Sequence, residues 1–239
     1  MLDGKFILAV VPARSSSKGV ADKNLRKLAG ISLIGRAGLV LGELDFLDAR
    51  VISTDSPGYV EEAARFGLDA PFIRPAVLSG DDAGIVETMQ HAIAESEAHY
   101  SVRFDVTLII EPSSPMRIAA DVTGAVRLLI DSGADSVATM SRVPTKYHPD
   151  KLLVEEGGRL DFFTETGRSI VGRQMLSDGP LYKNGLCYAL TRECIIDRSA
   201  VFTDNTLALI TEREVVNVDD ENELTWAELL LSARDANAR

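Results

Sequence analysis

The sequence predicts an α/β protein in which helices cover both faces of a parallel β-sheet. Two observations support this fold class. Short, continuous apolar runs recur along the chain, as expected for strands that are buried on both faces, and segments with helical periodicity separate these runs. The chain has 239 residues and no linker rich in proline or glycine, so residues 1–239 are expected to form a single domain.

The first half of the chain alternates between strand and helix signals. The opening run KFILAVV at 5–11 is continuously apolar, and Ser32 stands at the expected start of a helix. Gly67 closes the second predicted helix, because glycine readily adopts the left-handed conformation that ends many helices. Strands are expected at 5–11, 49–54 and 70–73, and helices at 32–44 and 58–67.

The second half continues this alternation but breaks it near Ser141. Residues 152–163, LLVEEGGRLDFF, predict a hairpin that turns at Gly157 and Gly158. The irregular region from about 141 to 187 therefore predicts a small inserted lobe. Helices are expected at 82–100, 119–133 and 220–236, and strands at 105–110, 134–140, 185–190, 206–210 and 214–218.

Composition excludes several classes of protein. The formal net charge of −11 argues against a general nucleic-acid binder, whose surface would be basic. No apolar stretch approaches the ~18 residues needed to cross a bilayer, so no membrane partner is expected. The N-terminus lacks a secretory signal pattern, and Cys187 and Cys194 suggest no metal or disulfide framework, which favours a cytoplasmic protein.

A small polar loop follows the first predicted strand and contains the cations Arg14, Lys18 and Lys23. In open α/β sheets, ligands bind beyond the carboxyl ends of the strands, where such a loop can neutralise a triphosphate. The sequence ARSSSKG has neither the P-loop spacing nor a dinucleotide-binding fingerprint. The loop alone is equally compatible with a phosphate site and with a solvated basic turn.

Six blocks of sequence, in order, resemble the CMP-sialic acid synthetases, the acylneuraminate or nonulosonate cytidylyltransferase family. The blocks are PARSSSKGVADKN, VISTD, IRPAVLSGDDA, EPSSPMR, NGLCY and VVNVDDENEL. The resemblance covers nearly the whole chain and implies a Rossmann-like, mostly parallel sheet with helices on both faces. It also implies that the inserted lobe at about 141–187 forms a homodimer and reaches into the neighbouring active site.

The resemblance further implies a reaction. Members of the family couple CTP to the anomeric hydroxyl of a 2-keto-3-deoxy sugar acid and release pyrophosphate, with Mg²⁺ as the cofactor and Mn²⁺ as an alternative. A sialic, legionaminic or pseudaminic acid is the expected substrate, because EPSSP is closer to the sialate type than to the Kdo type. Two alternatives stay open: a nucleotidyltransferase for Kdo or for another sugar or nucleotide, and a degenerate member that binds nucleotide or sugar without catalysis.

Matching the blocks residue by residue assigns candidate roles. The resemblance assigns catalysis to Arg14, Lys18 and Asp219. The candidate nucleotide contacts are Arg14, Ser17, Lys18, Lys23, Asn24, Arg74 and Ser79. The candidate sugar contacts are Glu111, Lys151, Arg173, Lys183, Asn184 and Tyr188. Three positions keep an alternative: Asn24 as a cap, Tyr188 as a core aromatic, and Arg117 as either a ligand-facing residue or a surface cation.

Two positions depart from the family pattern. The candidate metal ligands are Asp219 and Asn217, but the family has aspartate at both positions, so this chain lacks one charge. Strand alternation would place 217 and 219 on one face, whereas Asp220 begins a capping box with Glu223. The family usually has glutamine where this chain has Glu111. Under one hypothesis Glu111 compensates for Asn217 at the metal, and under the other it binds a different polar group of a different sugar.

Overall fold

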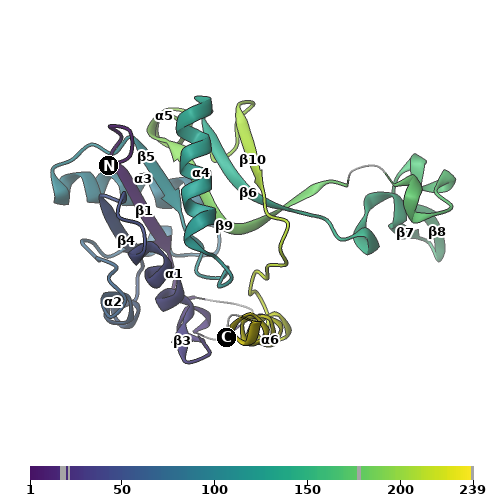
Figure 1. The fold of residues 1–239 in the computed structure, drawn as a ribbon, viewed down its shortest axis with the longest axis horizontal. Coiled ribbons are helices and arrows are strands. Elements are labelled where there is room, and N and C mark those ends of the chain that lie inside the picture. The colour runs from purple at the N-terminus through teal and green to yellow at the C-terminus, as the bar shows by residue number, and fades with distance from the viewer. Residues whose placement is uncertain (17–19, 21, 177–178, 238–239) are drawn as a thin grey trace.

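The computed structural model describes residues 1–16, 20, 22–176 and 179–237. Within these residues, six strands form one sheet in the order β10-β6-β9-β5-β1-β4 (Figure 1). The strands are β1 (Ile7–Pro12), β4 (Ala49–Ser53), β5 (Val106–Ile109), β6 (Ser136–Arg142), β9 (Leu181–Thr191) and β10 (Thr206–Ile210). Strand β9 is antiparallel to both of its neighbours, and the other pairs are parallel. The predicted mostly parallel sheet is confirmed.

Helices cover both faces of this sheet. The helices on the faces are α1 (Leu33–Gly42), α2 (Pro57–Ala64), α3 (Ile85–Tyr100), α4 (Ala119–Ser132) and α5 (Arg192–Ile196), and the last helix of the chain is α6 (Glu221–Asn237). In β1, Ile7 and Val11 join a core with α1, α2 and α4, whereas Leu8 and Val10 join a second core with α3 and α5. Because both faces of the strand are buried, its sequence is continuously apolar rather than alternating.

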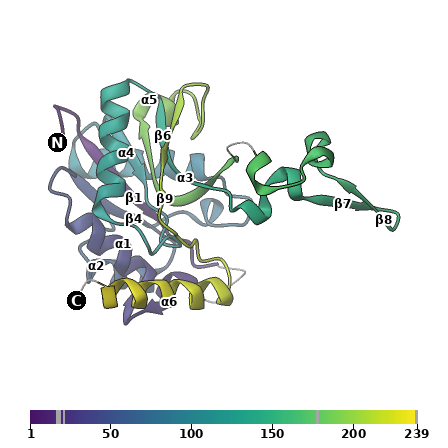
Figure 2. The ribbon, with the colours of Figure 1, turned by 45° about the vertical axis from the view of Figure 1, so that its right-hand side comes forward.

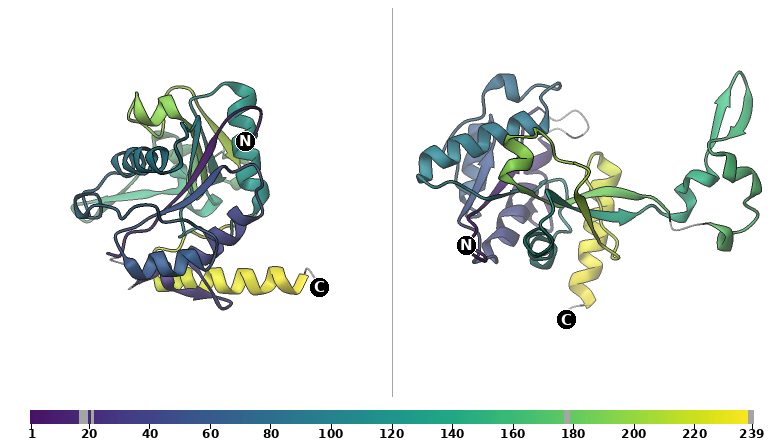
Figure 3. Two further views of the ribbon diagram at one scale, coloured as in Figure 1. Left: turned by 90° about the vertical axis from the view of Figure 1, so that its left-hand side faces the viewer. Right: turned by 90° about the horizontal axis from the view of Figure 1, so that it is seen from above.

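Helix α6 packs across one end of the sheet, as Figures 2 and 3 show. Its Leu224, Ala227 and Leu231 share a third core cluster with Leu28 of the short hairpin β2 (Lys27–Leu28) and β3 (Ile31–Ser32). The predicted capping box starts this helix. The Glu223 amide donates to Asp220 Oδ1 at 2.8 Å, and the Asp220 amide donates to Glu223 Oε2 at 3.1 Å.

Two predicted strands are wrong. Residues 70–73 pair with nothing beyond an isolated bridge between Val51 and Asp69, and Pro71 has no amide to extend a ladder. Residues 214–218 form no strand, because Val215, Val216 and Val218 are buried against α6 and β2 rather than in the sheet. Their apolar character reflects packing on a helix, which sequence periodicity over five residues does not distinguish from a strand.

The chain between β6 and β9 projects away from the body of the protein on a stem made by these two strands (Figure 1). The described part of this projecting segment comprises residues 143–176 and 179–180, because 141–142 and 181–187 belong to the stem. It carries the predicted hairpin, β7 (Leu153–Glu156) and β8 (Arg159–Phe162), which turns at Gly157 and Gly158 with φ of +61° and +80°. Every residue of both hairpin strands is exposed in the single chain.

A candidate nucleotide-binding site

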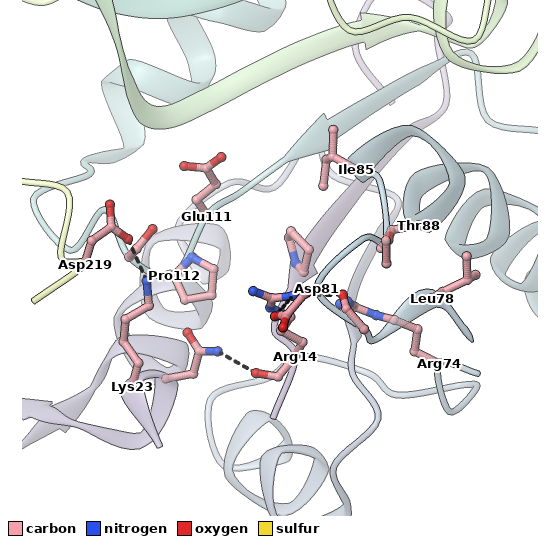
Figure 4. Close-up of a pocket in the computed structure, with 15 residues that line it drawn as sticks. Arg14, Lys23, Arg74, Leu78, Asp81, Ile85, Thr88, Glu111, Pro112 and Asp219 are labelled. Atoms are coloured by element: carbon pink, nitrogen blue, oxygen red, sulfur yellow. Dashed lines mark hydrogen bonds and ion pairs between the residues drawn. The ribbon is translucent and has the colours of Figure 1, made fainter. Parts of the chain in front are cut away.

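A cavity of about 480 Å³ lies at the carboxyl ends of β1 and β5 (Figure 4). The loops after these strands, the turn before α3, the first turn of α3 and Asp219 just before α6 line it. Its charged lining residues are Arg14, Lys23, Arg74, Asp81, Glu111 and Asp219. The cavity is therefore placed where open α/β sheets bind ligands, and it is polar rather than apolar.

Arg14 follows β1 directly and is held from both sides. Its guanidinium donates to the Gly80 carbonyl at 2.8 Å and forms an ion pair with Asp81 at 3.3 Å. Its own carbonyl accepts from the side chain of Asn24 at 3.3 Å. Asn24 is buried within the short 3-10 turn Lys23–Leu25 and forms no helix cap. It supports the backbone that carries Arg14.

Arg74 lines the cavity but is almost fully buried. Its guanidinium donates to the hydroxyl of Ser53 at 3.1 Å and also to the carbonyl of the same residue. Burial lowers the pKa of Arg74 to about 10, so the side chain remains a cation at neutral pH. Ser79 lies beside it in an adjoining hollow of about 720 Å³, with its hydroxyl donated to the Pro75 carbonyl at 3.2 Å.

Lys23 and Asp219 form an ion pair across the cavity mouth, with Nζ and Oδ1 2.8 Å apart. The side chain of Asp219 is 70% exposed whereas that of Lys23 is 17% exposed, so the carboxylate is the partner open to a ligand. Asn217 does not line the cavity. Its Oδ1 is buried without a hydrogen-bond partner among the described residues. Because this segment is not a strand, the predicted alternation does not apply to positions 217 and 219.

Glu111 enters the cavity from the end of β5 (Figure 4). Its carboxylate packs against Gly185, where φ is +68° and a Cβ atom would lie 2.3 Å from Glu111 Oε2. Burial raises the pKa of Glu111, and the charge of Asp219 adds to that rise, whereas Arg117, Lys183 and Lys23 oppose it. Glycine at position 185 is thus the residue that makes room for this carboxylate.

Arg117 is neither a ligand-facing residue nor a surface cation. It is 4% exposed, and it donates to the Glu111 carbonyl at 2.6 Å, to the Gly185 carbonyl at 3.0 Å and to the Leu186 carbonyl. Burial lowers its pKa to about 10. Arg117 therefore ties the loop after β5 to β9 behind the cavity. Sequence alone gave no signal for this, because a buried arginine bonded to carbonyls reads like any other arginine beside a helix start.

The candidate sugar contacts are dispersed. Asn184 is 1% exposed and is occupied by hydrogen bonds, since its amide donates to Ser141 and accepts from the Leu186 amide. Tyr188 is buried in the second core, 6.1 Å from the ring centroid of Phe202, and burial raises its pKa. Neither residue lines the cavity.

Lys183 is the exposed candidate nearest the cavity. Its Nζ lies 5.9 Å from the Phe202 ring centroid, and its charge acts on Glu111. Lys151 lies on the projecting segment beside a separate hollow of about 410 Å³. Arg173 begins a 3-10 turn on the same segment. Ser17 and Lys18 lie outside the described residues.

Sequence reasoning missed two acidic residues. Asp81 pairs with Arg14 at the cavity wall, and Asp55 accepts hydrogen bonds from Ser15. The helix predicted at 82–100 begins later than expected, because Gly84 is the N-cap of α3. The only available signal was that Asp55 and Asp81 follow a predicted strand and a predicted loop inside matched blocks.

Comparisons with known proteins give further information on the class of protein. A sequence model of the family described as cytidylyltransferase matches residues 8–120, which include Arg14, Arg74 and Glu111. The match covers 113 of the 239 residues and includes most of the residues that line the cavity. No helix in the described ranges is long and apolar enough to cross a membrane.

Individual relatives indicate which cytidylyltransferases the chain resembles. The chain is 27% identical to a CMP-N,N'-diacetyllegionaminic acid synthase of Legionella pneumophila, over 92% of this chain and 93% of the relative. It is 23% identical to an N-acylneuraminate cytidylyltransferase of Escherichia coli, over 92% of this chain but 51% of that protein. The structure of a CMP:2-keto-3-deoxy-manno-octonic acid synthetase complexed with CTP shares the fold, with a TM-score of 0.70 and 15% identity over 96% of this chain and 99% of that one. The chain is thus similar over most of its length to enzymes named as synthases of CMP-activated acids of the legionaminic and sialic type.

Proposed function

We propose that the protein joins CTP to a nonulosonic acid of the sialic, legionaminic or pseudaminic type, giving the CMP-sugar and pyrophosphate. The observation that carries this proposal is the convergence of Arg14, Lys23 and Arg74 on one cavity. In a chain with a net charge of −11, the three cations balance the three acidic residues of the lining, and their side chains suit a polyanion such as a triphosphate. The family relationship supplies the nucleotide and the class of acid.

The reaction is a nucleotidyl transfer, in which positioning and charge neutralisation supply most of the catalysis. The anomeric oxygen attacks the α-phosphorus of CTP, and the bond from that phosphorus to the bridging oxygen breaks. The electron pair of this bond leaves with pyrophosphate, and the anomeric hydroxyl gives up its proton to solvent. Arg14 and Lys23 neutralise the charge that develops on the leaving group, and Arg74 fixes the nucleoside side.

We also propose Mg²⁺ as the cofactor, with Mn²⁺ as a substitute. Asp219 offers an exposed carboxylate to the cavity, and oxygen donors suit Mg²⁺, which often combines one or two carboxylates with substrate phosphates. The described part of the chain contains no cluster of three or more His, Cys, Asp or Glu that could hold a metal, so the phosphates of CTP would complete the coordination. The bound cation would neutralise phosphate charge.

A homodimer is the third part of the proposal. The projecting segment exposes Leu153, Leu160, Phe163 and Val171, and its hairpin has no core of its own in one chain. A second copy of the segment would cover these apolar side chains, and obligate dimer interfaces are rich in such residues. Lys151 and Arg173 would then reach the cavity of the neighbouring subunit rather than their own.

We place the enzyme in the cytoplasm, without a nucleic-acid or membrane partner. Cys187 and Cys194 are free and buried, as expected of thiols in a reducing compartment. The acidic net charge opposes binding to nucleic acid.

The test is pyrophosphate release with CTP, Mg²⁺ and a panel of sialic, legionaminic and pseudaminic acids plus Kdo. We expect turnover of at least one nonulosonic acid with CTP and at least 100-fold less with ATP, GTP or UTP, about 3 kcal/mol of discrimination. Turnover of Kdo alone would contradict the proposed acid. CTP binding without release for every acid, in Mg²⁺ and in Mn²⁺, would indicate a binding protein instead of an enzyme.

A further inference from the structure

Two hydrogen bonds join the loop after β1 to the loop after β4, the strand that neighbours β1. The Ser15 amide donates to Asp55 Oδ1 at 2.8 Å, and the Ser15 hydroxyl donates to Asp55 Oδ2 at 2.7 Å. Asp55 lies just after β4, which pairs with β1 in parallel. Both oxygens of one carboxylate thus hold one residue, and each bond is charge-assisted.

The residues on either side of Ser15 are fastened to a different element. Arg14 donates to the Gly80 carbonyl at 2.8 Å, and Ser16 donates to the Ser79 carbonyl at 3.2 Å. Three consecutive residues are therefore bonded to the loop after β4 and to the loop before α3. A segment fixed in this way loses little conformational entropy when a ligand binds, whereas a free loop must be ordered first.

Asp55 also acts on the nucleoside side of the cavity. It lies close enough to Arg74 for its charge to oppose the fall in the pKa of Arg74 that burial causes. Burial tends to raise the pKa of Asp55 itself, but the two bonds from Ser15 and the charge of Arg74 lower it, and the net direction is downward. Asp55 is therefore an anion at neutral pH, and it lines the adjoining hollow together with Ser16 and Arg74.

We propose that Asp55 is a positioning residue that holds the Arg14–Ser16 loop in its phosphate-binding arrangement before CTP arrives. The inference rests on the proposed function, because it assigns the phosphates of CTP to this loop. Asp55 acts through Ser15 and Arg14 and touches no reacting atom. Its loss should weaken CTP binding while leaving the sugar acid and the chemical step nearly unchanged.

The main experiment compares Asp55→Ala with wild type in CTP binding by calorimetry, in steady-state kinetics and in hydrogen exchange at the Ser15 amide. We expect the Kd and KM for CTP to rise about 10-fold, because two charge-assisted hydrogen bonds are lost. The KM for the sugar acid should change less than twofold, and the Ser15 amide should exchange faster. Asp55→Asn should recover much of the loss, since its side chain offers an acceptor to the amide and a donor to the hydroxyl.

Asp135→Ala is the matched control. Asp135 accepts from the Thr203 hydroxyl at 2.7 Å and from Arg198 at 2.8 Å, but it stands at the amino end of β6, away from the cavity. We expect this variant to lose stability without any change in CTP affinity. If Asp55→Ala does not fold, Ser15→Ala replaces it, with an expected rise of about threefold in the KM for CTP from the loss of one hydrogen bond.

The possible outcomes separate this inference from the function on which it rests. Wild-type protein that neither binds nor turns over CTP overturns both. Wild-type turnover together with an unchanged CTP Kd in Asp55→Ala, or in Ser15→Ala if that variant replaces it, overturns the positioning role alone. A loss of CTP affinity that appears equally in Asp135→Ala also overturns it, because the cause would then be general destabilisation.

Discussion

The two sides of the cavity are built in different ways. On the nucleotide side, Arg14, Asn24 and Arg74 are each held by hydrogen bonds within the chain, and all three line one cavity. On the sugar side, Lys183 is exposed near Glu111, whereas Lys151 lies on the projecting segment.

This difference indicates which half of the site a single chain can complete. A nucleotide site made from strand ends is rigid, because the sheet fixes the positions of its loops. Under the proposed homodimer, a sugar site whose basic residues lie on the projecting segment would be completed by another copy of that segment. Changes on the nucleotide side should therefore act within one subunit, and changes on the segment should act between subunits.

The largest effect should come from Arg14. We expect Arg14→Met to lower kcat/KM for CTP about 1,000-fold, since removing one fixed charge that stabilises a developing anion costs about 4 kcal/mol. Pyrophosphate release at varied CTP measures this. Arg65→Met is the control, because Arg65 is an exposed cation at the carboxyl end of α2 that pairs only with Glu62 in the described chain. A loss below 10-fold for Arg14→Met would contradict the assignment of the cavity to phosphates.

Mixing two inactive variants tests most directly whether the nucleotide side acts within one subunit and the projecting segment acts between subunits. Arg14→Met damages the nucleotide side, and Lys151→Ala, expected to be at least 100-fold less active, damages the segment. If the segment completes the neighbouring site, refolding the two together should restore about a quarter of wild-type activity, because half of the dimers are mixed and each has one intact site. Activity that stays at the average of the two parents would show that each chain uses its own Lys151.

The sheet and the nucleotide side were accessible from sequence because their signals are local. The continuous apolar run at β1 and the cation that follows it directly already place Arg14 at a strand end. The wrong strand at 214–218 had the same apolar signal, but its valines pack on α6. Whether such valines pack on a helix or in a sheet depends on residues far away in sequence, so a five-residue pattern cannot predict it.

The placement of buried polar groups was equally inaccessible from sequence. Asn184 matched a sugar-contacting block, yet its amide is consumed by Ser141 and by a backbone amide in the core of β9. Arg117 and Asp55 gained their roles from carbonyls and amides that lie far from them in sequence. Only the fold brings these partners together.

A smaller effect tests whether Arg117, which ties the loop after β5 to β9, stabilises the fold. Arg117→Leu would leave the carbonyls of Glu111, Gly185 and Leu186 buried without this donor, which should cost about 3 kcal/mol of unfolding free energy. Urea unfolding measures the change. Arg65→Leu serves as the exposed counterpart and should stay within about 0.5 kcal/mol of wild type. A cost below about 1 kcal/mol for Arg117→Leu would contradict the bracing role.

The Mg²⁺ requirement distinguishes the two hypotheses for Glu111, a role at the metal and a contact with the sugar. If Glu111 supports the cation that Asp219 binds, Glu111→Gln should raise the Mg²⁺ concentration for half-maximal activity about fivefold, and Mn²⁺ bound in the presence of CTP should weaken by a similar factor in electron paramagnetic resonance titrations. If Glu111 contacts the sugar instead, both metal titrations should remain unchanged and the KM for the acid should shift. Asp219→Asn provides the positive control for metal loss.

The smallest expected effect is the pH dependence of stability at the same residue. Burial and Asp219 raise the pKa of Glu111 in the folded protein, so the folded state binds more protons than the unfolded state between the ordinary glutamate pKa of about 4.3 and the raised value. Wild-type stability should therefore fall as pH rises through that window, whereas Glu111→Gln has no carboxyl to ionise there. Urea unfolding at pH 5 and pH 8 should show Glu111→Gln gaining stability relative to wild type at the higher pH. If the difference in unfolding free energy between the two proteins is the same at both pH values, Glu111 is as well solvated in the folded protein as in the unfolded chain. The sugar side of the cavity would then be open to water rather than closed off by Gly185 and Arg117.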